Sequence, residues 1–213
     1  MKTTGLIFDM DGTLWDSSRE VAASWAEVLA RHPEAGRTVT QADVMGIMGL
    51  TMTGIADRLF PQLDRAGRDR LLQECTDYEN EYLRIHGGKL YPGLEETLER
   101  LHREWPLFIV SNCQKGYIET FLDHYGYWRF FQDIECFGNT GLPKDGSLRL
   151  VAERNGLSGF YYLGDIQGDY EATKAAGGHF IHAAYGFGQI EDPVPRVLSL
   201  TELPALLATL EKR

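Results

Sequence analysis

Short apolar runs recur along the chain, and stretches in which apolar residues follow helical spacing lie between them and after the last. The apolar runs are GLIFDM at residues 5–10, PLFIVSN at 106–112, DIECFG at 133–138, FYYLGD at 160–165 and HFIHAAY at 179–185. The helical patterns of this part of the chain cover residues 94–105, 115–126, 147–156, 169–177 and 201–212. Short, nearly continuous apolar runs are typical of strands that are buried on both faces. The alternation predicts an α/β fold in which helices cover both faces of a doubly wound parallel sheet.

The alternation is interrupted after the first run, because Trp15 to about Gly88 contains no convincing strand pattern. Helical patterns fill this interval, around residues 17–32, 40–60 and 65–86. We therefore predict an inserted α-helical cap domain, with boundaries at 16–87. The remaining residues, 1–15 and 88–213, would form the α/β core domain.

The first helix of the insert has a recognisable start. Apolar residues recur at helical spacing from Val21 to Leu29, and polar residues precede them. Asp16 or Ser17 is expected to cap the N-terminus. Glu20 lies three residues after Ser17, which completes the pattern of a capping box.

The first apolar run ends in two aspartates, Asp9 and Asp11, directly before Gly12. An Asp-Gly pair between apolar runs can form the turn of a hairpin. A hairpin needs a second strand, however, and the residues that follow have helical spacing instead. The unit is therefore a strand, an acidic loop and a helix, and the acidic pair calls for a chemical explanation.

Other polar residues are expected at the same edge of the sheet, because ligands of open parallel sheets bind beyond the carboxyl ends of the strands. The second apolar run ends in Ser111 and Asn112, and the fourth ends in Asp165, with Asp169 four residues later. Lys144 lies in a predicted loop before a helix. Each residue alone could be a helix cap, a loop residue or a solvated charge. Together they would gather four carboxylates and one amine, and a divalent cation such as Mg²⁺ would relieve the repulsion.

Composition limits the possible partners. The chain has 213 residues, of which 43% are hydrophobic and 24% charged, so it can bury a sizeable core. Its net charge of −10 argues against a nucleic-acid or anionic membrane surface. No apolar run reaches membrane-spanning length, and the first is too short for a signal peptide, so we expect a cytoplasmic protein. The three cysteines are too widely spaced to suggest a disulfide framework or a metal site, and no protein partner can be inferred.

These motifs resemble the haloacid dehalogenase superfamily, specifically its phosphatase branch with a small helical cap, which includes the phosphoglycolate phosphatase and β-phosphoglucomutase-like subfamily. DMDGT at residues 9–13, the Ser-Asn pair, a downstream lysine and GDIQGD at 164–169 follow in the order of the family, and LYPGLEETLERL at 90–101 resembles its return from cap to core. Two features depart from the pattern. Pro143 precedes Lys144, whereas the family proline often follows the lysine, and Cys113 follows the Ser-Asn pair.

The resemblance implies an Mg²⁺-dependent phosphatase that hydrolyses a small phosphorylated metabolite through an aspartyl-phosphate. Asp9 would be the nucleophile, and Asp11 would be the general acid and then the general base. Mg²⁺ would be held by Asp9, the backbone carbonyl of Asp11, and Asp165. Asp169 would support a bound water or orient the lysine. The phosphoryl oxygens would be bound by four residues, Thr13, Ser111, Asn112 and Lys144.

The resemblance also implies a movable cap. The chain leaves the catalytic loop at Trp15 and Asp16 and returns near Gly87 and Gly88, which is the geometry of a hinge. Gly87 and Gly88 could instead only end a helix. Two further glycines could form a mobile loop of the cap that faces the substrate, or merely break a helix, namely Gly46 and Gly49.

Four alternatives to a phosphatase can be compared with these residues. A dehalogenase would need neither Mg²⁺ nor an acid two residues after the nucleophile, so Asp11 argues against it. A phosphomutase of the β-phosphoglucomutase type would use the same residues, but the arginine-serine signature of its cap is missing from MGIMGLTMTGIADRLF. A receiver-like signalling module places its acidic pair and its phospho-acceptor on different strands and lacks an insert of this size, whereas here the candidate acceptor and its acidic neighbour share one strand end. An inactive scaffold is disfavoured because the acidic set is complete.

Overall fold

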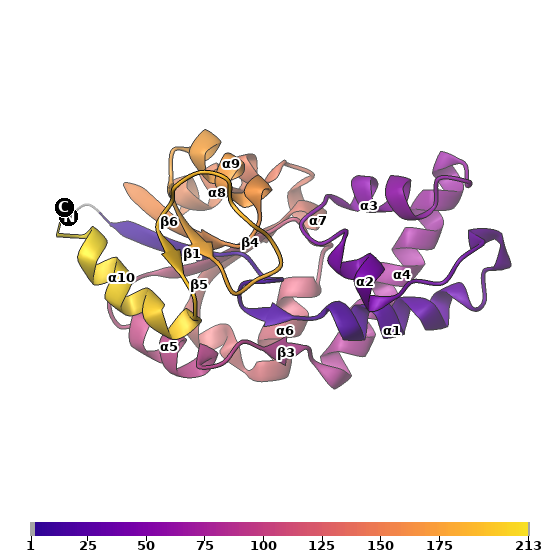
Figure 1. Cartoon of the computed structure of the whole chain (residues 1–213), viewed down its shortest axis with the longest axis horizontal. Coiled ribbons are helices and arrows are strands. Elements are labelled where there is room, and N and C mark those ends of the chain that lie inside the picture. Colours follow the sequence, from indigo (N-terminus) through magenta and orange to yellow (C-terminus); the bar gives the residue numbers. More distant parts are fainter. Residues whose placement is uncertain (1–2, 213) are drawn as a thin grey trace.

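The computed structural model describes residues 3–212 (Figure 1). Its strands are β1 (Thr4–Phe8), β2 (Trp15–Asp16), β3 (Lys89–Leu90), β4 (Leu107–Ser111), β5 (Phe131–Cys136), β6 (Gly159–Gly164), β7 (His179–Ala183) and β8 (Arg196–Val197). Its α-helices are α1 (Ser18–Leu29), α2 (Gln41–Met45), α3 (Met52–Leu59), α4 (Arg65–His86), α5 (Leu94–Leu101), α6 (Tyr117–Tyr125), α7 (Phe137–Thr140), α8 (Lys144–Arg154), α9 (Gln167–Ala176) and α10 (Leu203–Leu210).

The main sheet has six strands in the order β5-β4-β1-β6-β7-β8, and all of its pairings are parallel. The central strand β1 pairs Phe8 with Ile109 of β4 and with Leu163 of β6. Because the three strands run in the same direction and in register, the residues that follow them emerge at one edge. This register brings the predicted polar residues of the three strand ends toward one another.

Side chains of β1 alternate between two hydrophobic clusters, one on each face of the sheet. Leu6 and Phe8 belong to the cluster that contains the apolar residues of α5, α6 and α10. Ile7 belongs to the second cluster, which α8 and α9 complete. Figure 1 shows these two groups of helices on opposite sides of the strands. The predicted doubly wound parallel sheet is confirmed.

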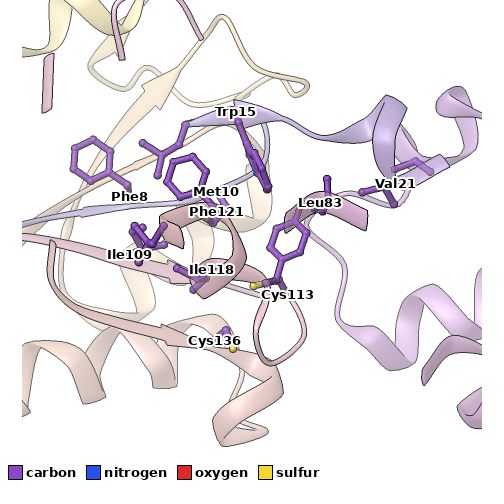
Figure 2. Packing of buried hydrophobic residues seen from close by; sticks show 14 of the residues in the cluster. Phe8, Met10, Trp15, Val21, Leu83, Ile109, Cys113, Ile118, Phe121 and Cys136 are labelled. Carbon is purple, nitrogen blue, oxygen red and sulfur yellow. The ribbon is translucent and has the colours of Figure 1, made fainter. Parts of the chain in front are cut away.

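The helical insert, α1 to α4, lies beyond one end of the sheet (Figure 1). Two of its residues, Val21 and Leu83, belong to the same hydrophobic cluster as Trp15 and Phe121 of the neighbouring core, as Figure 2 shows. Trp15 packs edge-on against the Phe121 ring with centroids 5.0 Å apart. The insert therefore shares buried apolar contacts with the core at its base, while its division from the core at residues 16 and 87 stays a prediction.

Three very short strands escaped prediction. Trp15–Asp16 and Lys89–Leu90 form an antiparallel pair where the chain enters and leaves the insert. The expectation that no strand lies between Trp15 and Gly88 is therefore wrong, because β2 occupies the first two residues of this interval. Arg196–Val197 adds the sixth strand of the main sheet. Two residues are too few to show a hydrophobic period, so pairing partners alone define these strands.

The predicted helical segment over residues 40–60 is two helices, α2 and α3, separated by residues 46–51, so the helix is broken in the region of Gly46 and Gly49, as one interpretation of these glycines proposed. Gly49 has φ of +80°, a left-handed conformation that cannot continue an α-helix. The Thr51 side chain then accepts a hydrogen bond from the Gly54 N–H and caps α3.

The longest helix, α4, has 22 residues and carries many charged side chains. Within residues 3–212, no helix combines the length and the apolar character that crossing a bilayer requires. The cytoplasmic location stays a prediction.

Candidate active site

Asp9 lies at the centre of the polar edge, directly after β1. Its backbone N–H donates to the Leu163 carbonyl of β6 at 2.9 Å, so the sheet holds the residue in place. Lys144 Nζ lies 3.1 Å from Asp9 Oδ1, but without hydrogen-bond geometry, and no described residue donates to this oxygen. Burial raises the pKa of Asp9 to about 7, against the opposing effect of Lys144. Asp9 Oδ1 is therefore a buried oxygen that the Lys144 ammonium faces.

Lys144 is the first residue of α8, which begins three residues before the predicted helix of residues 147–156, so its predicted place in a loop is wrong. Its ammonium also pairs with Asp169 Oδ1, and its side chain is 4% exposed. Burial alone would lower the pKa of Lys144, but the carboxylates of Asp169 and Asp9 outweigh burial and raise it. The other oxygen of Asp169 accepts from the backbone N–H groups of Asp165 and Ile166 at 3.1 and 3.2 Å. Asp169 thus fixes both the lysine and the turn after β6.

Three carboxylates gather at this point. One oxygen from each of Asp9, Asp165 and Asp169 lies within 4.8 Å of the others. Asp165 Oδ2 accepts from the Phe187 N–H at 2.7 Å. Burial, followed by the charges of Asp169 and Asp9, raises the pKa of Asp165 to about 8. The carboxylate oxygens of Asp9 and its two neighbours are hard donors of the kind that Mg²⁺ binds, so the cluster fits such an ion.

Two glycines allow the acidic loop to approach Asp165 closely. Gly12 has φ of +79°, and a Cβ at this position would lie 2.1 Å from Asp165 Oδ2. A Cβ at Gly186 would lie 2.3 Å from the Gly12 carbonyl oxygen and 2.4 Å from Asp165 Cβ. No side chain fits at either position without displacing the Asp165 carboxylate.

Asp11 stands apart from the three-carboxylate cluster and has its own partners. Its Oδ1 accepts hydrogen bonds from the hydroxyls of Ser17 and Tyr117, both at 2.7 Å. Burial raises the pKa of Asp11 to about 6, although these hydrogen bonds oppose the shift. A carboxyl with such a pKa exchanges protons near neutral pH, as a general acid and base must.

Ser17 and Tyr117 were missed as site residues. Asp16 or Ser17 was expected to cap α1, with Ser17 in a capping box with Glu20. The Ser17 side chain makes no capping hydrogen bond and turns to Asp11 instead, so the capping box is wrong. Of the two expected residues, it is Asp16 whose carboxylate accepts from the Ser18 N–H at the start of α1. Tyr117 lies on α6, and nothing in its sequence neighbourhood distinguishes it from a core aromatic.

The predicted phosphate-binding residues are only partly brought together. Ser111 and Asn112 line the same cavity as Asp9 and Asp11. The Asn112 side-chain amide donates to the Gly49 carbonyl of the insert at 2.9 Å, and its oxygen has no donor among the described residues. Thr13 has a buried hydroxyl without a partner among residues 3–212, and it does not line this cavity.

The predicted hinge residues lie at the base of the insert. Trp15 and Asp16 form β2, and the Gly88 N–H donates to the Tyr125 hydroxyl at 3.1 Å. Gly87 ends α4 with φ of +66°. A Cβ there would lie 2.5 Å from both His124 Nε2 and the Tyr125 hydroxyl. These contacts tie the base of the insert to α6, and the hinge role stays a prediction.

The two loop glycines of the insert differ. Gly46 ends α2 with φ of −73°, which any residue adopts. Gly49 contacts the core on two sides, through its carbonyl on Asn112 and through its backbone against Ile166, where a Cβ would lie 2.3 Å from Cδ1. Of the two, Gly49 lies against the edge of the site.

The cavity between the sheet edge and the insert has a volume of about 50 Å³. Asp9, Asp11 and Ser111 line it from the core, and apolar residues of α1 to α3 line it from the insert. It also includes Glu79 of α4, which the sequence did not single out.

Comparisons with known proteins agree with this geometry. A model of the haloacid dehalogenase-like hydrolase family matches residues 6–183. The chain is 28% identical to a phosphoglycolate phosphatase of Aliivibrio fischeri, over 96% of this chain and 95% of the relative. It is 30% identical to a phosphoglycolate phosphatase of Vibrio cholerae, over 90% and 89% of the two chains. A crystal structure from Bacteroides fragilis, assigned as a haloacid dehalogenase-like hydrolase, superposes with a TM-score of 0.82 at 25% identity, covering 95% of this chain and all of that one.

The family match spans the strand that carries Asp9, the insert, and the strands that carry Ser111 and Asp165. The resemblance inferred from the motifs is thereby confirmed. The chain belongs to the haloacid dehalogenase-like hydrolase family and is an enzyme of its phosphatase branch.

Proposed function

We propose that this enzyme hydrolyses the phosphate monoester of a small molecule through an aspartyl-phosphate on Asp9, with Mg²⁺ as cofactor. One observation carries the proposal: the Asp9 carboxylate lies inside the acidic cluster with Oδ1 beside the Lys144 ammonium, while Asp11, two residues later, is held outside the cluster by Ser17 and Tyr117. Two carboxyl groups in different environments suit two different roles, a nucleophile and an acid.

The cofactor would be held by the carboxylates of Asp9 and Asp165 and by the backbone carbonyl of Asp11. When bound, Mg²⁺ would neutralise charge between the substrate phosphate and these carboxylates. Asp169 has both oxygens engaged, by Lys144 and by backbone N–H groups, and is better suited to orient Lys144 than to bind the ion directly.

In the first step a carboxylate oxygen of Asp9 attacks phosphorus, and the bond to the leaving alkoxide breaks. Asp11, with one oxygen held by Ser17 and Tyr117, donates its proton to that alkoxide. In the second step Asp11 takes a proton from water, which attacks the aspartyl-phosphate and releases inorganic phosphate and free Asp9. Lys144, Ser111 and the Asn112 amide would bind the phosphoryl oxygens, where negative charge must be stabilised; Thr13 would add a hydroxyl only if its side chain turned toward the site.

We also propose that residues 16–87 act as a cap that opens relative to the core of residues 1–15 and 88–213. The Gly49 contacts with Asn112 and Ile166 lie at the edge of the cavity and join the insert to the core. Opening at these contacts, with Trp15, Asp16, Gly87 and Gly88 at the base, would admit the substrate.

Phosphate release from p-nitrophenyl phosphate tests the proposed function. We expect turnover that requires Mg²⁺ and stops with EDTA, and mass spectrometry of acid-quenched enzyme should place the phosphoryl group on the peptide that contains Asp9. Turnover without a divalent cation, or a phosphoryl group on another residue, would contradict the proposal. Persistent stoichiometric labelling without turnover would favour the receiver-like interpretation instead.

A further inference from the structure

The wall that the insert contributes to the cavity is apolar. Its residues come from α1 to α3 and the loop between α2 and α3, and they include Val21, Trp25, Val44, Ile47, Met48 and Ile55. No lysine, arginine or histidine lines the cavity, whose lining residues all belong to the described part of the chain. The leaving group of the substrate therefore meets hydrocarbon and no positive charge.

Glu79 is the one charged residue that the insert adds to this lining. Its side chain is buried on α4, where Oε2 accepts from Trp25 Nε1 and Oε1 accepts from Gln114 Nε2 at 2.8 Å. Both donors are neutral, and none of the ion pairs among residues 3–212 involves Glu79. Burial consequently raises the pKa of Glu79 to about 8, and Asp11 adds to the shift. The remaining charged residues of the lining, Asp9 and Asp11, are acidic as well.

We propose that Glu79 is a specificity-determining residue that selects phosphate esters of small alcohols bearing an ammonium group over esters bearing a carboxylate. The proposal rests on the phosphatase function described above. An ammonium group would favour the ionised form of Glu79 and would form a charge-assisted hydrogen bond with it beside the indole of Trp25, and the apolar wall would cover the carbon atoms of the alcohol. A carboxylate at the same place would face Glu79 in a low-dielectric cavity without a counter-charge.

This inference departs from the names of the relatives. Phosphoglycolate carries a carboxylate on the carbon next to its ester oxygen, so the leaving group would bring a second negative charge into the cavity. A purely structural Glu79, which only joins Trp25 to Gln114, would affect all substrates alike. Charge selectivity among esters of equal size separates the two roles.

The test compares three esters of similar size in Mg²⁺ at about pH 9, above the pKa of Glu79: 2-aminoethyl phosphate, 2-hydroxyethyl phosphate and phosphoglycolate. We expect kcat/KM to decrease in that order, with the amino ester at least about tenfold above phosphoglycolate. The amino ester gains an attractive contact with Glu79 and phosphoglycolate meets a repulsive one, and the difference between the two contacts corresponds to a factor of this size or more. Equal values, or a preference for phosphoglycolate, would overturn the inference while leaving the phosphatase function intact. No turnover of these esters or of p-nitrophenyl phosphate would overturn both.

Glu79→Gln sharpens the test, because it removes the charge and keeps the shape, and Gln114 can turn its amide to pair with it. The ratio of amino ester to phosphoglycolate should fall about tenfold, whereas 2-hydroxyethyl phosphate should change less than about threefold. Glu81→Gln, an exposed position on the same helix, is the matched control and should leave the ratio unchanged. An equal loss for all three esters would make Glu79 structural and contradict the proposal. If Glu79→Gln fails to fold, the wild-type order of the three esters still decides.

Discussion

The two sides of the cavity are built on different principles. The core side consists of charged groups fixed by backbone contacts, as in Asp9, whose N–H is bonded to β6, and Asp169, which accepts from two N–H groups. The insert side consists of apolar side chains and one buried carboxylate, Glu79. The core side would act on the phosphoryl group, which every substrate shares, and the insert side would meet the leaving group, which differs. Substitutions on the core side should therefore reduce turnover of all esters, and those on the insert side should change selectivity or KM.

The largest effect is expected from Asp9→Asn. The amide is a poor nucleophile and a poor metal ligand, so kcat should fall at least about a hundredfold on every ester. This loss corresponds to an increase of about 3 kcal/mol or more in the activation free energy. Asp145→Asn, next to Lys144 but paired outward with Arg149, is the control and should remain active. Retention of more than about a hundredth of the activity by a folded Asp9→Asn protein would remove Asp9 from the nucleophilic role.

The next effect concerns Asp11. Asp11→Asn should lower kcat about a hundredfold for an alkyl ester, whose leaving group needs a proton, and should slow breakdown of the phosphoenzyme. Tyr117→Phe removes one hydrogen bond to Asp11 Oδ1 and should cost only about fivefold, because Ser17 still donates. Rapid-quench measurement of phosphoenzyme and phosphate separates the two steps. An unchanged rate for an alkyl ester in Asp11→Asn would contradict the acid and base assignment.

A smaller effect is expected where the insert meets the core. Gly49→Ala introduces a Cβ against Ile166 and strains φ, so closure should weaken and KM should rise about fivefold with a smaller change in kcat. Gly46→Ala is the matched control, because its φ of −73° tolerates a side chain. The alanine variants of Gly87 and Gly88 are less informative, since a Cβ there collides with His124, Tyr125 or Trp15. Equal KM values for the two variants would show that closure at Gly49 does not contribute to binding.

The smallest effect is on stability, and it depends on pH. The pKa of Asp165 is raised from 3.8 to about 8, so the folded metal-free protein binds more protons than the unfolded chain between these values. Its contribution to stability is complete below pH 4 and is lost as the pH rises through 8. In EDTA the Tm should therefore be about 5 °C lower at pH 8 than at pH 5.5, and Mg²⁺ should restore it mainly at pH 8. Asp165→Asn should reduce this difference, whereas equal stabilisation by Mg²⁺ at both pH values would contradict the cluster as a metal site.

The difference between the core side and the insert side also explains how much of the fold and of the candidate site could be predicted from the sequence. Buried parallel strands appear in sequence as apolar runs, and the residues at their ends are adjacent because of the strand order, so Asp9, Ser111 and Asp165 could be placed at one edge. The insert offered no such rule. Whether Gly49 breaks a helix, and which face of α4 turns inward with Glu79, depends on contacts between helices that a single helical pattern does not specify. Ser17 and Tyr117 were missed because their role depends on a side-chain meeting across a hundred residues of chain.

Gly12 and Gly186 carry no chemistry, yet they limit how this enzyme can be redesigned. Each position faces the Asp165 carboxylate so closely that a methyl group would occupy the space of its atoms. In a library of all single substitutions, changes at these two positions should abolish activity as often as changes at catalytic residues do. The same changes should reduce the amount of folded protein much less. Engineering of new specificity should therefore vary the residues of the insert and leave these two glycines untouched.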